Sequence, residues 1–167
     1  MMVPRRIGPL VRGILFSVAL LASLPPAGAD TLDDERRFSV VDLAEQPVDL
    51  AALLATHRAV LVNFWASWCA LCKEEIPALA RLHERSGEEG IAIIGVNVGE
   101  SARKVQAYAE RLGINYPVVL DPDSELAEAW NVVGLPLSML VHADGTLSGP
   151  YSGYTQQMQD DIAAVLE

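Results

Sequence analysis

The stretch FWASWCALCKEEIP, residues 64–77, carries most of the information in this sequence. It contains both cysteines of the chain, Cys69 and Cys72, with only two residues between them. A disulfide stabilises a fold most when it closes a long loop, and this pair would close almost none. The pair is better suited to redox chemistry, in which one exposed thiolate attacks a disulfide and the second thiol resolves the mixed disulfide.

The residues on either side of the motif predict a buried strand followed by a helix. Residues 59–65 form a nearly continuous apolar, β-branched run, which is typical of a strand buried on both faces. Apolar residues recur at helical spacing over residues 72–85, which predicts an amphipathic helix kinked at Pro77. We therefore expect the cysteines at a helix N-terminus, whose partial positive charge lowers the pKa of Cys69 below its free value near ~8.5.

The rest of the chain predicts one α/β domain, since 167 residues fall within the usual size of a single domain. A turn at residues 45–47 joins the first two strands, and Ser101 and Thr155 are expected helix N-caps. The β-α-β order demands a parallel strand pair. We expect strands at residues 38–41, 48–50, 91–98, 137–141 and from about 147 to 154, an extended segment at 116–120, and helices at 51–56, 101–112, 125–130 and 156–166.

Residues 1–29 predict a secretory signal peptide. Three arginines precede the apolar stretch 13–24, and small residues ending at Ala29 provide a cleavage site. An uncleaved membrane anchor is the alternative, but the 12 residues of that stretch fall short of the roughly 20 that span a bilayer. We expect cleavage after Ala29, a flexible lead-in at residues 30–37, a domain at residues 38–167, and a periplasmic or otherwise extracytoplasmic location.

Charge narrows the possible partners. From Asp30 onward the chain has 22 acidic and 9 basic residues, a net charge of −13. Such a chain repels phosphate backbones and anionic lipid headgroups, which disfavours nucleic-acid binding and electrostatic membrane binding.

A zinc site is the main alternative reading of two closely spaced cysteines. Tetrahedral zinc would need two further ligands, and the chain offers only His57, His83 and His142, scattered and without ligand spacing. We therefore expect neither a metal nor a cofactor.

The motif resembles the active-site signature of thioredoxin-like proteins and is most similar to the exported TlpA/ResA-type disulfide reductases. Three later segments strengthen the resemblance: VNVGES at 96–101, YPVVLD at 116–121 and GLP at 134–136. It covers the chain from about Phe38 onward. It implies a three-layer thioredoxin-like α/β fold, with a central mixed sheet flanked by helices, an N-terminal β-hairpin and a central insertion.

The resemblance also implies roles for individual residues. Cys69 is then the attacking cysteine and Cys72 the resolving one. Pro136 matches a cis-proline that faces the cysteines and aligns a partner's backbone, and Leu135 precedes it in the substrate-binding segment. Trp68 matches an indole that shields the attacking sulfur. The residues Leu71 and Leu137 depart from the family pattern, in which proline and threonine are frequent.

Glu75 is the most informative match. Ordinary thioredoxins place a buried aspartate where this chain has Asn63, and an asparagine cannot act as a base. Three helical residues span about 300°, so Glu75 and Cys72 share one side of the helix. A partly buried carboxylate there would have a raised pKa and could take the proton of Cys72.

These observations predict a monomeric protein-disulfide reductase that draws electrons from a membrane thiol donor. The resemblance implies exported disulfide-containing substrates, such as proteins of cytochrome c or copper-site assembly. Alternatives are a disulfide oxidant and a Cu(I) metallochaperone with the two thiolates as soft ligands. A peroxidase on a related fold is disfavoured, because the proline- and threonine-containing loop before its cysteine is missing.

Overall fold

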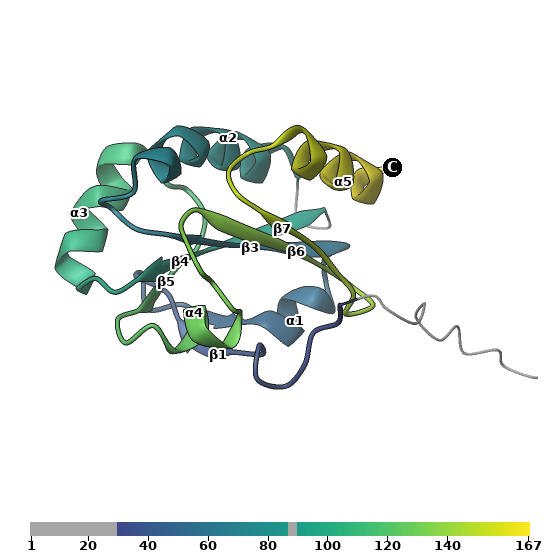
Figure 1. Cartoon of the computed structure of the whole chain (residues 1–167), viewed down its shortest axis with the longest axis horizontal. Coiled ribbons are helices and arrows are strands. Elements are labelled where there is room, and N and C mark those ends of the chain that lie inside the picture. The colour runs from purple at the N-terminus through teal and green to yellow at the C-terminus, as the bar shows by residue number, and fades with distance from the viewer. Residues whose placement is uncertain (1–29, 87–89) are drawn as a thin grey trace, which may run out of the picture.

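The computed structural model describes residues 30–86 and 90–167, which form one α/β unit (Figure 1). The expected elements are confirmed, although the last strand ends at Tyr151 and not near Tyr154. The strands are β1 (Ser39–Val41), β2 (Pro47–Asp49), β3 (Ala59–Trp65), β4 (Ile91–Val98), β5 (Val118–Asp121), β6 (Leu137–His142) and β7 (Leu147–Tyr151). The helices are α1 (Leu50–Leu54), α2 (Ala70–Ser86), α3 (Ala102–Leu112), α4 (Glu125–Ala129) and α5 (Gln156–Leu166).

The strands make a small hairpin and a larger mixed sheet, as the resemblance implied. β1 pairs antiparallel with β2, and the five-stranded sheet has the order β5-β4-β3-β6-β7. β3 runs parallel to β4 and β4 parallel to β5, whereas β6 is antiparallel to both β3 and β7. The segment between β4 and β6, which contains α3, edge strand β5 and α4, lies where the central insertion was expected.

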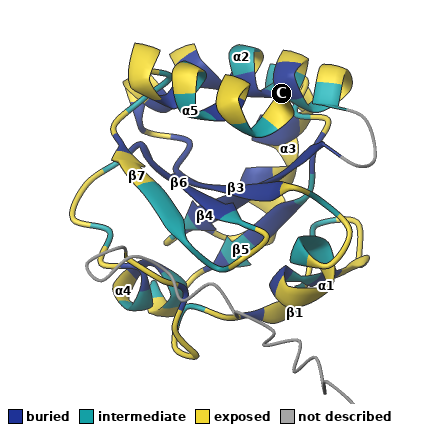
Figure 2. Cartoon of the chain, turned by 90° about the vertical axis from the view of Figure 1, so that its right-hand side faces the viewer, coloured by how far each residue is buried: buried dark blue, intermediate teal, exposed yellow. Residues whose placement is uncertain are grey.

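Helices cover both faces of the sheet. α2, α3 and α5 lie on one side, and α1, α4 and the β1–β2 hairpin lie on the other (Figures 1 and 2). All seven residues of β3 are buried between these layers. Because side chains alternate along a strand, Leu61, Asn63 and Trp65 face α2, and their neighbours face α1 and α4.

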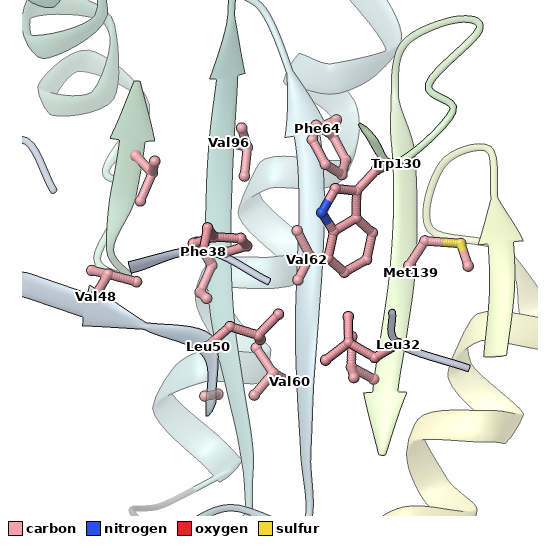
Figure 3. Packing of buried hydrophobic residues seen from close by; sticks show 14 of the residues in the cluster. Leu32, Phe38, Val48, Leu50, Val60, Val62, Phe64, Val96, Trp130 and Met139 are labelled. Atoms are coloured by element: carbon pink, nitrogen blue, oxygen red, sulfur yellow. The ribbon is translucent and has the colours of Figure 1, made fainter. Parts of the chain in front are cut away.

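The layer beneath the sheet holds the largest apolar cluster, part of which Figure 3 shows. Phe64 of β3 packs on Trp130, which follows α4, with ring centroids 5.8 Å apart. Several buried aliphatic residues, among them Val60, Val62 and Met139, complete the contact. This packing fixes β3, and with it the cysteine motif that follows the strand.

The lead-in at residues 30–37, expected to be flexible, packs against the domain. Leu32 is buried in the apolar cluster around Phe64 and Trp130, and its N–H donates to the carbonyl of Gly145 at 2.8 Å. Trp130 Nε1 donates to the carbonyl of Arg36, whose guanidinium in turn bonds Asp30 at 3.1 Å. The charged composition of the segment gave no indication that its one apolar residue, Leu32, would be buried.

Helix ends follow the sequence, with one partial exception. Gly113 ends α3 in the left-handed conformation, and the Thr155 side chain accepts a hydrogen bond from the N–H of Met158 at the start of α5. Ser101 occupies the N-cap position of α3, yet no capping hydrogen bond to its side chain is found in the described part of the chain.

Residues 1–29 lie outside the described residues, so the predicted signal peptide and its cleavage site remain predictions. Within the ranges 30–86 and 90–167, no helix combines the length and the hydropathy that a membrane span requires.

Candidate active site

The two cysteines lie where the motif predicts, at the start of α2 directly after β3. Cys69 precedes Ala70, the first residue of α2, and forms a disulfide with Cys72 across a Cα–Cα distance of 5.3 Å. The N–H of Cys72 donates to Sγ of Cys69 at 3.1 Å. When the disulfide opens, this amide and the helix N-terminus are in place to stabilise a thiolate at Cys69.

Behind the disulfide, a buried polar group links α2 to the two central strands. Glu75 is 2% exposed, and its Oε1 accepts a hydrogen bond from Asn63 Nδ2 at 2.7 Å. The same Nδ2 donates to Ser138 Oγ at 2.9 Å, in the strand after Pro136. β3 and β6 place Asn63 and Ser138 directly opposite each other in register.

Burial raises the pKa of Glu75 to about 7, and the hydrogen bond from Asn63 offsets only part of that effect. Its second oxygen, Oε2, has no hydrogen-bond partner among the described residues. The expected burial of this carboxyl is thereby confirmed, and its role as a proton acceptor stays a prediction. A carboxyl that titrates near neutral pH can both accept and release a proton there.

The segment before β6 completes the surroundings of the cysteines. The Leu135–Pro136 peptide bond is cis, as the resemblance implied, and a second cis bond at Gly149–Pro150 was not anticipated. Leu135 packs against the apolar cluster that contains both cysteines.

The exposed residues directly before Cys69 and between the two cysteines are apolar. Trp68 is 68% exposed and Leu71 is 58% exposed, so the residues flanking Cys69 lie open to solvent. A cavity of about 340 Å³ opens between Leu71, Glu75 and the loop after β7. Its remaining lining residues are Glu74, Ala78, Ser152, Gly153 and Tyr154.

A second buried carboxylate supports the loop that carries Trp68. Glu100 is 6% exposed and accepts hydrogen bonds from the N–H and Oγ of Ser67, each at 2.6 Å. Asn97 Nδ2 donates to it at 2.9 Å, and Lys104 forms an ion pair with it. Burial would raise the pKa of Glu100, but the hydrogen bonds from Lys104, Ser67 and Asn97 outweigh burial and lower the pKa to about 2.

The sequence did not single out Ser138, Ser67 or Glu100. A signal for Glu100 existed, since it follows the end of β4, next to the end of the parallel strand β3 that leads into the cysteine motif. Ser138 carried no such signal because it is separated from Asn63 by 75 positions.

His57, His83 and His142 do not join the cysteines in any ligand cluster. Within residues 30–86 and 90–167, no group of three or more His, Cys, Asp or Glu side chains could hold a metal ion.

Comparison with known proteins gives a consistent result. A family model described as the AhpC/TSA family matches residues 33–149. The thiol-disulfide oxidoreductase ResA of Bacillus subtilis is 33% identical over 135 residues, which are 80% of this chain and 74% of that protein. ResA of Halalkalibacterium halodurans is 28% identical over 146 residues, covering 87% of this chain and 80% of the relative.

A solved structure agrees with these relatives. The crystal structure of a thiol:disulfide interchange protein of the thioredoxin family from Chlorobium tepidum superposes with a TM-score of 0.68 at 30% identity. The superposition covers 78% of this chain and 94% of that one. The thioredoxin-like fold and the disulfide chemistry expected from the motif are thereby confirmed.

Proposed function

From the premise that this chain belongs to the AhpC/TSA family as a ResA-type thiol-disulfide oxidoreductase, we propose that it is an exported reductase of protein disulfides. The observation that carries the proposal is the buried Glu75–Asn63 pair behind the disulfide at the start of α2, in which Cys69 is 6% exposed and Cys72 is fully buried. Within this pair, the carboxylate of Glu75 can accept a proton in the resolving step, whereas the amide of Asn63 cannot act as a base.

In the proposed reaction, the Cys69 thiolate attacks a partner disulfide. A bond forms between Cys69 Sγ and one partner sulfur, and the other partner sulfur leaves as a thiolate. Cys72 then loses its proton and attacks Cys69 Sγ, which releases the second partner thiolate and forms the Cys69–Cys72 disulfide. The partner gains two electrons, and the enzyme disulfide is reduced again by a thiol donor.

Glu75 takes the proton of Cys72 in this scheme. Cys72 is fully buried, so bulk water has little access to its thiol. With a pKa of about 7, the Glu75 carboxylate is available in its ionised form at neutral pH, yet basic enough to accept a proton. The cavity that Glu75 lines offers that proton a way to solvent.

The surface around the disulfide supports a protein substrate. The exposed Trp68 and Leu71 offer apolar contacts beside Cys69. The cis bond before Pro136 suits the role of aligning a partner backbone, with Leu135 next to it. Selected exported proteins of cytochrome c or copper-site assembly are the proposed substrates, and a membrane thiol protein is the proposed donor to a monomeric enzyme in the periplasm or an equivalent compartment.

The proposed direction is reduction. The residues between the cysteines, Ala70 and Leu71, include no histidine that would further stabilise a thiolate and so favour the dithiol form. A pair without that stabilisation gives up its electrons more readily.

Redox equilibration against glutathione or dithiothreitol, with thiol trapping, tests the direction. We expect a potential well below about −200 mV, whereas a value near −120 mV would identify an oxidant. A Cys69→Ser variant is the control, and a wild-type protein without a reversible disulfide would exclude both directions. Titrating the reduced protein with Cu(I) tests the metallochaperone alternative separately.

Trapping tests the assigned roles of the two cysteines. A Cys72→Ser variant cannot resolve the mixed disulfide and should accumulate partner adducts through Cys69, whereas Cys69→Ser should accumulate few. Equal capture by both variants would contradict the assignment.

A further inference from the structure

We propose that Glu100 is a positioning residue of the active site, which acts through Ser67 to hold the cysteine-bearing loop in place after the disulfide has opened. The proposal deepens the proposed function and rests on it, since it assigns a role in the same thiol chemistry.

Glu100 connects two loops at the same edge of the sheet. β3 and β4 are parallel, so the loops that follow them, at residues 66–69 and 99–101, emerge side by side. The carboxylate reaches across and accepts from both the backbone N–H and the hydroxyl of Ser67, at 2.6 Å each. Ser67 is two residues before Cys69, so these hydrogen bonds act close to the attacking sulfur.

Two further donors bind the same carboxylate oxygens. Asn97 is fully buried in β4 and donates to Oε2 of Glu100 at 2.9 Å, and Lys104 from α3 pairs with Oε1. A buried carboxylate with four donors is strongly oriented, because losing any donor leaves a charge poorly solvated. Glu100 is therefore a fixed point to which the loop of Ser67 is attached.

This attachment matters most in the dithiol state. While the disulfide is closed, a covalent bond ties Cys69 to Cys72 in α2. After reduction that bond is gone, and the loop is held by weaker contacts: the hydrogen bond from Cys72 N–H to Cys69 Sγ, the turn from Cys69 N–H to the carbonyl of Ala66, and the Ser67–Glu100 pair. The dithiol is the state that attacks a substrate, so loosening the loop should impair attack.

Ser67→Ala is the sharpest test because it removes one hydrogen bond and changes no charge. We expect the midpoint of the pH profile for Cys69 alkylation to move upward, because a displaced sulfur is stabilised less by the amides of α2. The rate constant for reduction of a small aromatic disulfide should fall about threefold. Ser101→Ala is the matched control, since Ser101 is exposed and adjacent to Glu100, and it should change neither quantity.

Replacing Glu100 tests the other side of the contact. Glu100→Ala should slow the same reaction about tenfold, and Glu100→Gln, which keeps the size and one acceptor oxygen, should restore part of the rate. In the double variant of Ser67 and Glu100, the rate should be no lower than in Glu100→Ala alone, because Glu100→Ala already removes the acceptor of the Ser67 hydroxyl. If Glu100→Ala does not fold, Glu100→Gln and Ser67→Ala still provide the comparison.

Two results would overturn the proposal. One is an unchanged alkylation midpoint and rate in Ser67→Ala and Glu100→Gln, even if their melting temperatures fall. The other is a multiplication of the two single losses in the double variant. Failure of the proposed function is a separate outcome, since wild-type protein would then lack a reversible disulfide or equilibrate near about −120 mV as an oxidant.

Discussion

Two glutamates are buried near the disulfide, and they behave in opposite ways. Glu75 is 2% exposed and has a pKa raised to about 7, whereas Glu100 is 6% exposed and has a pKa lowered to about 2. The difference lies in the hydrogen-bond donors: among the described residues, Asn63 alone donates to Glu75, whereas Ser67, Asn97 and Lys104 all donate to Glu100. Burial alone therefore does not set the pKa of a carboxyl. The poorly satisfied carboxyl suits proton transfer, and the well satisfied one suits fixing a loop.

The largest expected effect separates the two glutamates by activity. Glu75→Gln should lower the rate of mixed-disulfide resolution by about 10³-fold, or ~4 kcal/mol, because the amide cannot accept a proton. The rise in rate with pH through about 7 should disappear with it. Stopped-flow measurement of the resolving step checks this, and the exposed neighbour Glu74→Gln should leave the profile intact.

The second prediction concerns stability between about pH 4.5 and pH 7. Because the folded state raises the pKa of Glu75, the unfolded state ionises first, and stability falls as pH rises through this window. The loss is about 3 kcal/mol at ~1.4 kcal/mol per pH unit. Urea unfolding of wild type and Glu75→Gln should show it only in wild type. A parallel decline in both proteins would assign it to other groups.

The third prediction reverses the sign for Glu100. Its lowered pKa contributes stability that is present above about pH 4.5 and is lost as pH falls toward about 2. Since the Lys104 side chain is 56% exposed, solvent screening reduces the contribution, and we expect about 2 kcal/mol. Acid unfolding of Glu100→Gln should lack this component. Glu110→Gln, which replaces an exposed glutamate of α3, is the control, and it should unfold in acid as wild type does.

The smallest expected effect tests the link between Asn63 and Ser138. Ser138→Ala removes one acceptor from Asn63 and should cost about 1 kcal/mol of unfolding free energy. Because the Asn63–Glu75 hydrogen bond remains, the pH midpoint of resolution should barely move. Chemical denaturation and the pH-rate profile measure the two quantities, and a large shift of that midpoint would show that Ser138 tunes Glu75 directly.

The contrast between these two glutamates also shows how far the sequence could be interpreted. Glu75 was accessible to prediction through the resemblance to TlpA/ResA-type proteins, and helix geometry added that it shares one side of the helix with Cys72, three residues earlier. Glu100 was present in the sequence as part of a matching segment, but its contact with Ser67 spans 33 positions. Contacts of that kind depend on strand order and register, which local periodicity does not contain.

The lead-in at residues 30–37 also shows a tertiary contact that the sequence did not predict. Its charged composition predicted flexibility, yet Leu32 is buried against the sheet and the N–H of Leu32 bonds Gly145. Composition describes average solvation, and one well-placed apolar side chain can outweigh it when a partner surface is available.

The amino-acid sequence by itself determined the element order and the close spacing of Cys69 and Cys72, because both follow from short-range patterns along the chain, whereas the disulfide chemistry and the candidate proton acceptor Glu75 rested on the resemblance to TlpA/ResA-type proteins. Only the tertiary structure decided how many donors reach each buried carboxylate, since these donors come from β3, β4, α3 and the loop after β3. Solvation inside a protein is assembled from residues distant in sequence, and it sets the pKa that the chemistry requires.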